Sequence, residues 1–469
     1  MPFIDSHLLE TIGYYFLNSL KNRPQAGIPS RYSLISRFDS KKLLILMVVV
    51  IITILIDSET GLIADFIPEQ LSSRVGVAAF IGIAIIFAIS QYFILAYVKQ
   101  SNKETRARVL HLDLTHSIVS IAQYILAGIL AFVILQIIIT QQYSIVTLYV
   151  SYTISYGLWI TTLGLLARAF FSWHRLSNKN VMVLILALSM IAYVVNGVIG
   201  LASSYDMLAQ QKLVITFKDV AFFPDFSIAS LGSQIGLANQ IASGIAYVLT
   251  WIGTAKLLYP HIKKLGKTKF WVIMGAAMAY YLVSFPLFVL GYFTPSENVD
   301  AMTNILIFSL GAVFSGVVFG AAFLSVARTL QKGSALRNHM ILAAYGFLLF
   351  YIAGSASAAQ AAYPPFGLAS VSFTGLSCYL IYSGLYSSAV TVSQDVSLRH
   401  SIRKSVTEQS KLLDSIGTAQ MEQEFQSRVL TITKKISGKM EEETGVEVSM
   451  TEEDMKEHIE MVRKEVHRS

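Results

Sequence analysis

Residues 117–139 read SIVSIAQYILAGILAFVILQIII, a run without a single charged side chain. A helix over this run is about 35 Å long, enough to cross the hydrocarbon core of a bilayer. Nine similar runs are Leu43–Ile56, Val75–Val98, Ile145–Leu166, Val181–Ala202, Ile235–Leu257, Phe270–Phe293, Met302–Val326, Met340–Ala361 and Leu368–Val392. The sequence therefore predicts an all-α, polytopic transmembrane bundle of about ten spans over residues 42–392, with the lipid bilayer as its partner.

The composition supports this class. Of 469 residues, 54% are hydrophobic and only 14% are charged, whereas a soluble protein has about a quarter charged residues. The single cysteine, Cys378, excludes a disulfide framework and a cysteine-ligated metal centre built by one chain. No nucleotide-binding loop, HExxH helix or GxSxG elbow is present. A non-catalytic protein is therefore expected rather than an enzyme, a membrane enzyme acting on lipid is the alternative, and no cofactor or nucleic-acid partner is expected.

Basic residues predict the orientation. Between the N-terminus and the last span, 21 Lys and Arg lie in the first segment and the even-numbered loops, and only Arg74, Lys212 and Lys218 lie in the odd-numbered loops. Lys and Arg near span ends are retained on the cytoplasmic side. We therefore expect a multi-pass protein of the cell membrane with both termini in the cytoplasm.

Two segments outside the spans carry apolar patterns. In the N-terminal segment 1–41, apolar residues recur every four positions from Ile4 to Leu20, which predicts an amphipathic helix at the membrane interface or under the bundle. The outer loop 203–234 contains a predicted strand at Leu213–Phe217. Its aromatic residues are candidate ligand-recognition residues, or else they pack on the bundle; they are Phe217, Phe222, Phe223 and Phe226.

The tail, residues 393–469, changes composition abruptly to 12 basic and 15 acidic residues. Its pattern predicts helices. One apolar stripe has the 4-3-4 spacing of a coiled-coil seam and consists of Phe425, Val429, Ile432 and Ile436. A second helix begins at Thr451, and its stripe consists of Met455, Ile459, Val462 and Val466. Both stripes must be buried against something, so the tail is expected to dimerise, to dock on the inner loops or to bind a cytoplasmic protein.

Few polar positions stand out within the bundle. Asp113 and His116 share one face of a helix at the inner end of the third span, which makes them a weak candidate pair of metal ligands or proton-transfer groups. Ordinary interfacial polar residues are the alternative. Spans eight to ten are rich in small residues, which permit close helix packing or homodimerisation in lipid. The candidate packing glycines are Gly316, Gly320, Gly354 and Gly384.

Several motifs of the last quarter resemble a set of uncharacterised archaeal multi-pass membrane proteins. They are Tyr363-Pro364-Pro365-Phe366-Gly367, Tyr386-Ser387-Ser388-Ala389, Leu398-Arg399, Ile402-Arg403-Lys404 and Leu412-Leu413-Asp414-Ser415-Ile416-Gly417. The resemblance implies an archaeal cell membrane and assigns no activity. The uncharged spans, the apolar outer loop and a helical tail continuous with the last span favour a receptor or signal-transmitting scaffold. A channel or uniporter for an uncharged solute and a structural subunit of a membrane complex are the alternatives.

Overall fold

The computed structural model describes residues 40–62, 74–176, 180–217, 219, 231–262, 266–289, 299–331, 333–354, 361–404 and 408–444. The chain divides into Met1–Leu43, of which only the start of α2 is described, and Leu44–Ser469. The predicted N-terminal amphipathic helix and the tail beyond Thr444 lie outside the described residues.

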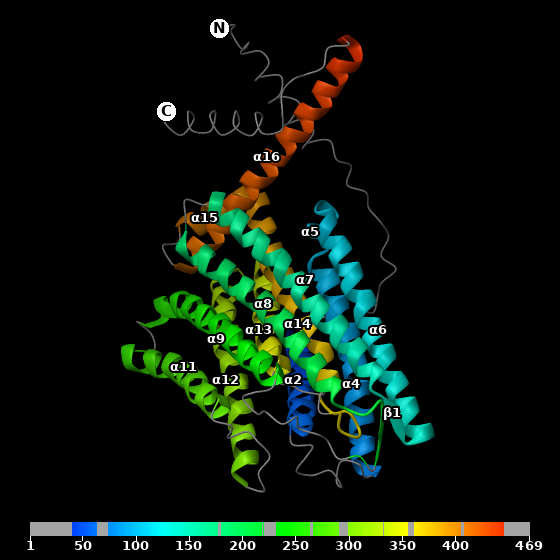
Figure 1. Cartoon of the computed structure of the whole chain (residues 1–469). Coiled ribbons are helices and arrows are strands. Elements are labelled where there is room, and N and C mark those ends of the chain that lie inside the picture. Colours follow the sequence, from blue (N-terminus) through cyan, green and yellow to red (C-terminus); the bar gives the residue numbers. More distant parts are fainter. Residues whose placement is uncertain are drawn as a thin grey trace. The chain divides into compact units, whose positions relative to one another are not determined.

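Nearly all described residues are helical (Figure 1). The first half holds α2 (Ser40–Leu62), α4 (Arg74–Ser101), α5 (Lys103–Arg108), α6 (Leu110–Thr140), α7 (Val146–Leu176) and α8 (Val181–Ala209). The second half holds α9 (Leu231–Leu258), the short 3-10 helix η1 (Tyr259–His261), α11 (Lys267–Val289), α12 (Val299–Thr329), α13 (Ala335–Gly354), α14 (Leu368–Gln394), α15 (Val396–Lys404) and α16 (Glu408–Thr444).

Eight described helices are long and apolar enough to cross a membrane, namely α4, α6, α7, α8, α9, α12, α13 and α14. They confirm a helical, membrane-embedded multi-pass class. The two remaining predicted spans coincide with α2 and α11, so the count of ten stays a prediction.

Two short strands pair at one end of the bundle. The strand β1 (Gln142–Ser144) connects α6 to α7, and β2 (Val214–Thr216) follows α8. They are antiparallel, with Tyr143 opposite Ile215. The predicted strand at Leu213–Phe217 is thus confirmed, whereas its partner was not foreseen because three residues are too short to show a period. We call this end of the bundle the strand end and the opposite end, which carries α5, α15 and α16, the tail end.

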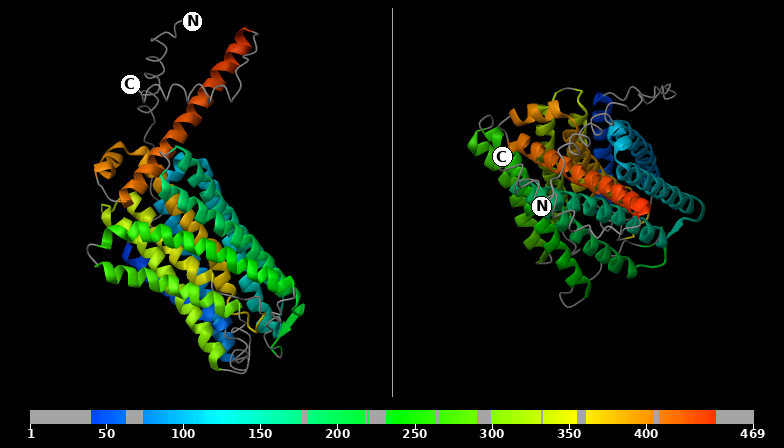
Figure 2. Two further views of the ribbon diagram at one scale, coloured as in Figure 1. Left: turned by 60° about the vertical axis from the view of Figure 1, so that its left-hand side comes forward. Right: turned by 90° about the horizontal axis from the view of Figure 1, so that it is seen from above.

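The core centres on α14, whose residues from Leu368 to Val390 are all buried. Helices α4, α6, α7, α13 and α16 pack around it (Figure 1, Figure 2). Two glycines of α14 allow neighbouring helices to approach it closely. A Cβ at Gly384 would lie 2.5 Å from the Ala343 nitrogen of α13, and one at Gly375 would lie 3.0 Å from the Ser155 carbonyl oxygen of α7. Small residues let helix backbones meet in this way.

Candidate functional site at the buried helix α14

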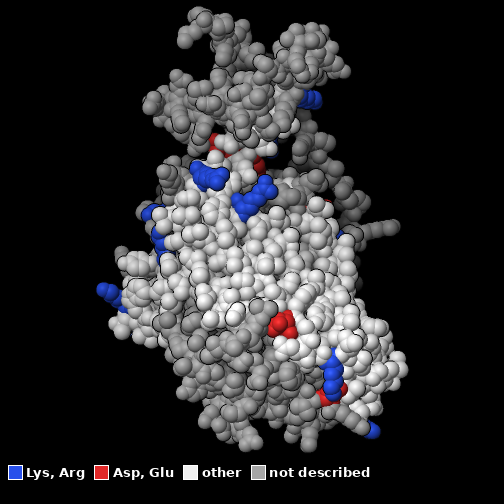
Figure 3. Space-filling model, in the orientation of Figure 1, with Lys and Arg blue, Asp and Glu red and all other residues white. Residues whose placement is uncertain are grey.

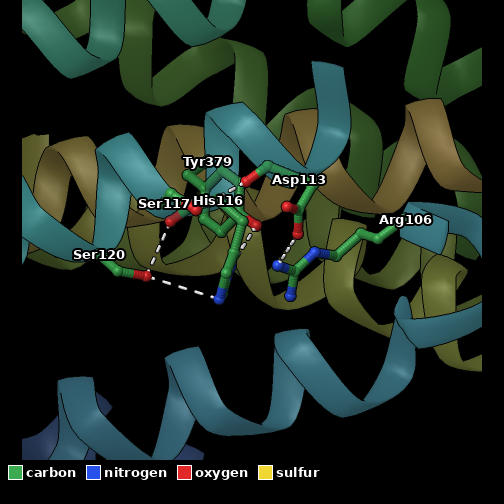
Figure 4. A network of polar contacts seen from close by, with 6 residues as sticks. All are labelled: Arg106, Asp113, His116, Ser117, Ser120 and Tyr379. Carbon is green, nitrogen blue, oxygen red and sulfur yellow. Dashed lines mark hydrogen bonds and ion pairs between the residues drawn. The ribbon is translucent and has the colours of Figure 1, made fainter. Parts of the chain in front are cut away.

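The predicted pair Asp113 and His116 lies in the first turns of α6. His116 Nδ1 is 2.8 Å from the Tyr379 hydroxyl on α14, and both side chains are buried. Asp113 is 53% exposed and forms an ion pair with Arg106 of α5. Figure 4 shows the two side chains directed to these separate partners. They therefore do not converge as a metal pair, and the described residues contain no group of three His, Cys, Asp or Glu side chains that could hold a metal.

Other polar side chains hold the tail-end half of α14. The Asn102 side-chain amide, just before α5, donates to the Ser383 hydroxyl. His339 of α13 is fully buried; its Nδ1 is 3.3 Å from the Thr391 hydroxyl, and its Nε2 is 3.3 Å from the Ser101 carbonyl oxygen. Buried polar groups are costly unless they are hydrogen-bonded, so these contacts set the position of α14 against its neighbours.

At the strand end, α14 begins with Gly367 in the left-handed conformation (φ +89°), and glycine has no side chain that could cap the helix. Asp57 of α2 supplies the missing acceptor. Its Oδ1 accepts the Gly367 N–H at 3.0 Å, and its Oδ2 accepts the Ser370 N–H and hydroxyl, each at 2.7 Å. A carboxylate at a helix N-terminus satisfies free N–H groups and faces the positive end of the helix dipole. Asp57, which is fully buried, therefore clamps α14 to α2.

At the tail end, the first part of α16 packs on the bundle. A Cβ at Gly417 would overlap Val392 Cγ1, so α16 and the end of α14 are in direct contact. Gln420 accepts a 2.9 Å hydrogen bond from the Trp173 indole of α7, and Ser415 accepts one of 2.7 Å from the Asn180 amide that caps α8. The base of α16 is therefore attached to α7, α8 and α14 together.

The tail is not a continuous extension of the last span, which corrects that expectation. Helix α14 ends at Gln394, and Asp395 is extended with φ −105° and ψ 104°. The Leu398 N–H and the Ser397 hydroxyl bond to its carboxylate and hold the pKa of Asp395 below its usual value. Asp395 therefore separates α14 from α15. Its side chain caps the first turn of α15, and a capping residue adopts a non-helical backbone conformation that interrupts the preceding helix.

Three further side chains with buried polar atoms lie on α7, α8 and α9. The Trp159 indole nitrogen and the side-chain oxygens of Asn196 and Asn239 are buried and have no hydrogen-bond partner among the described residues. They lie beside two glycines of α8: a Cβ at Gly197 would be 3.4 Å from the Trp159 ring, and one at Gly200 would be 3.3 Å from Asn239 Oδ1. Buried polar atoms without a partner are rare in native proteins, so an ordered water is the simplest partner for them.

The remaining predicted site residues are the aromatic residues of the outer loop and the candidate packing glycines. Phe217 is described and 46% exposed, while Phe222, Phe223 and Phe226 lie outside the described residues. Gly316 and Gly320 face α13: a Cβ there would lie 3.0 Å from the Leu348 and 2.8 Å from the Ala344 carbonyl oxygen, respectively. Gly384 makes the close contact given above. Gly354 is exposed, and a Cβ there would meet nothing within 4 Å, so it does not act as a packing glycine among the described residues.

Sequence reasoning missed Asp57, Gly346 and Gln420. A Cβ at Gly346 would lie 2.7 Å from the Ile381 nitrogen of α14, but one glycine in an apolar run gives no sign of its neighbour. Asp57 directly follows the first predicted span, Leu43–Ile56. The useful signal was its charge directly after fourteen uncharged residues. Comparison with known protein families, curated proteins and solved structures finds no match to this chain, and the resemblance of its last quarter to archaeal membrane proteins stays a prediction.

Proposed function

We propose that this protein is a non-enzymatic membrane receptor or signal-transmitting scaffold, in which α14 couples the strand end of the bundle to α16. The observation that carries the proposal is the double attachment of α14. Asp57 holds its first turn, and α16 contacts its last turn at Val392. A helix that is buried from Leu368 to Val390 and held at both ends is expected to move as one body, because packed interiors deform little.

The proposed topology follows from charge. Basic side chains gather near the tail end, and few charged side chains lie over the middle of the face in Figure 3. Together with the basic inner loops of the sequence, this favours a cytoplasmic tail end in a cell membrane, with the strand end outside. The output would then pass from α16 to a cytoplasmic protein partner.

The test changes one end of α14 and measures the other. In the full chain in lipid nanodiscs, Asp57→Asn weakens the clamp on the first turn of α14. If α14 transmits the change, hydrogen exchange over residues 408–423 becomes about threefold faster or more, because a loss of about 0.7 kcal/mol in local opening free energy has that effect. Exchange over α9 serves as the internal reference for global destabilisation.

The matched control is Asp219→Asn. Asp219 is also at the strand end, but it bonds to Thr216 of β2 and not to α14. Exchange over residues 408–423 should stay unchanged in this variant. If Asp57→Asn accelerates exchange only in the first turns of α14 and leaves residues 408–423 as in the wild type, the coupling role is wrong.

The second candidate function is passage of an uncharged polar solute, and the partnerless polar atoms of Trp159, Asn196 and Asn239 favour it. Neutral solutes with donor and acceptor groups could bond to them without any titratable group. Uptake of glycerol or urea by liposomes containing the protein, above that of empty liposomes, would support a channel or uniporter over a receptor.

A further inference from the structure

Helix α16 has two different halves. In its first half Leu412, Leu413, Ile416 and Ala419 are buried on the bundle. In its second half the predicted seam is open: Phe425, Ile432 and Ile436 are 52%, 47% and 49% exposed, and Val429 is half-buried. Figure 1 shows this half extending beyond the other labelled helices. An apolar stripe of this kind on a charged helix calls for a partner helix.

The sequence after α16 contains a stripe with the same spacing. Met455, Ile459, Val462 and Val466 are separated by four, three and four positions, as are Phe425, Val429, Ile432 and Ile436. The 4-3-4 pattern reads the same in both directions. An antiparallel arrangement can therefore bring all four positions of one stripe opposite all four of the other.

We propose that Thr451–Ser469 folds back as a helix on the exposed stripe of α16 and forms an antiparallel two-helix coiled coil. The four layers pair Phe425 with Val466, Val429 with Val462, Ile432 with Ile459 and Ile436 with Met455. In each layer an a-type position faces a d-type position, as antiparallel coiled coils require. This arrangement concerns the tail alone and holds whether or not α14 transmits a signal.

Charge supports the same register. The next layer places Lys439 opposite Glu452, and the flanking positions place Arg428 opposite Glu465. More broadly, residues 428–439 carry four basic and no acidic side chains, whereas residues 452–460 carry five acidic side chains and one basic. Opposite charges beside a seam select partner and orientation.

The connection is long enough. Helix α16 ends at Thr444, and Gly445 follows, a residue that favours helix termination. Residues 445–450 span up to about 20 Å when extended, whereas neighbouring helix axes lie about 8–10 Å apart. A short tether also keeps the second stripe at millimolar effective concentration.

A second copy of the chain is the competing occupant. The tails of two copies project from the same side of one membrane, so their α16 helices would pair in parallel. That pairing places Lys439 against Lys439, because a parallel dimer matches each position with itself. The folded-back segment offers Glu452 there and an equal number of apolar layers.

The experiment is disulfide trapping in membranes that contain the full chain. The only native thiol, Cys378, is buried, so the wild type serves as the background. Mild oxidation of Ile432→Cys/Ile459→Cys should link the two peptides within one chain. The mismatched pair Ile432→Cys/Val466→Cys should link at least about tenfold less, since one heptad displaces the thiols by about 10 Å, beyond disulfide geometry.

Two measurements keep the proposal falsifiable. Lys439→Glu should lower the yield of the matched disulfide, and adding Glu452→Lys should restore it, as in a double-mutant cycle. Equal linking in the matched and mismatched pairs would overturn the register. A dimer-sized product from Ile432→Cys alone, without the intrachain link in the matched pair, would show that a second copy covers the stripe.

Discussion

Helices α6 and α14 show how burial in this protein differs from burial in a soluble one. Helix α6 is the most apolar of the eight candidate spans and the least buried, with only 28% of its span inside the bundle. Helix α14 is among the least apolar and is buried throughout. In lipid the apolar side chains gain nothing by facing inward, so small and hydrogen-bonding residues occupy the interior.

The hydroxyl groups of α14 fit this interior because most find a local acceptor. Ser372 donates to the Leu368 carbonyl oxygen at 2.9 Å, and Ser388 donates to that of Gly384 at 2.6 Å. A hydroxyl that bonds to its own helix adds little volume and leaves no unpaired donor. The neighbouring backbones can therefore approach α14 closely. The comparison shows that α14, the span rich in hydroxyl groups and small residues, is the structural centre of the bundle.

The largest expected effect comes from filling a glycine on each helix. A Cβ at Gly384 would lie 2.5 Å from the backbone nitrogen of Ala343, whereas one at Gly128 of α6 would meet nothing within 4 Å. Gly384→Leu should therefore give no folded protein, and Gly384→Ala should cost about 1–3 kcal/mol of unfolding free energy through overpacking. Thermal unfolding in detergent, followed by tryptophan fluorescence, measures both.

Gly128→Leu and Gly128→Ala are the matched controls, and both should melt within a few degrees of the wild type. If Gly128→Leu and Gly384→Leu were equally harmful, α6 would be packed against another surface and the contrast between the two helices would fail.

The sequence predicted this contrast only in part. Apolar runs located the helices because a span must be uncharged over its length. The density of small residues in spans eight to ten indicated close packing, and backbones approach closely at Gly316, Gly320 and Gly384. The clamp by Asp57 could not be predicted, since its partner Ser370 is 313 residues away. The coiled-coil spacing of the tail was visible, but not the separation of α16 into a docked and an open half.

A smaller effect is expected from removing one hydroxyl on each helix. Tyr379 of α14 is buried and bonds to His116, whereas Tyr124 of α6 is 51% exposed. Tyr379→Phe should cost about 0.5–1 kcal/mol, because it takes a partner from a buried imidazole nitrogen and hydrogen bonds between membrane helices are worth about that much.

Tyr124→Phe should leave the unfolding free energy unchanged. Reversible unfolding of the two variants, measured side by side in the same detergent, decides the matter. An equal loss in both would mean that the exposed face of α6 carries a polar contact of its own.

The smallest effect concerns carboxylates at the strand end, where buried Asp57 contrasts with Asp219. The Lys212 ammonium and the Thr216 hydroxyl and N–H bond to Asp219 and lower its pKa to about 2. Because the folded pKa lies below the usual value of 3.8, this contribution is complete above pH 4 and is lost as the pH falls through about 2. Solvent screening keeps this contribution to the unfolding free energy below about 1 kcal/mol.

Exchange of the Tyr143 and Ile215 amides, divided by the intrinsic rate at each pH, should therefore accelerate only below pH 4. The substitution Asp219→Asn should abolish that acceleration. An acceleration that persists in Asp219→Asn would assign the acid sensitivity of the strand end to another carboxylate there, such as Asp57 or Asp206, and the role of Asp219 would be wrong.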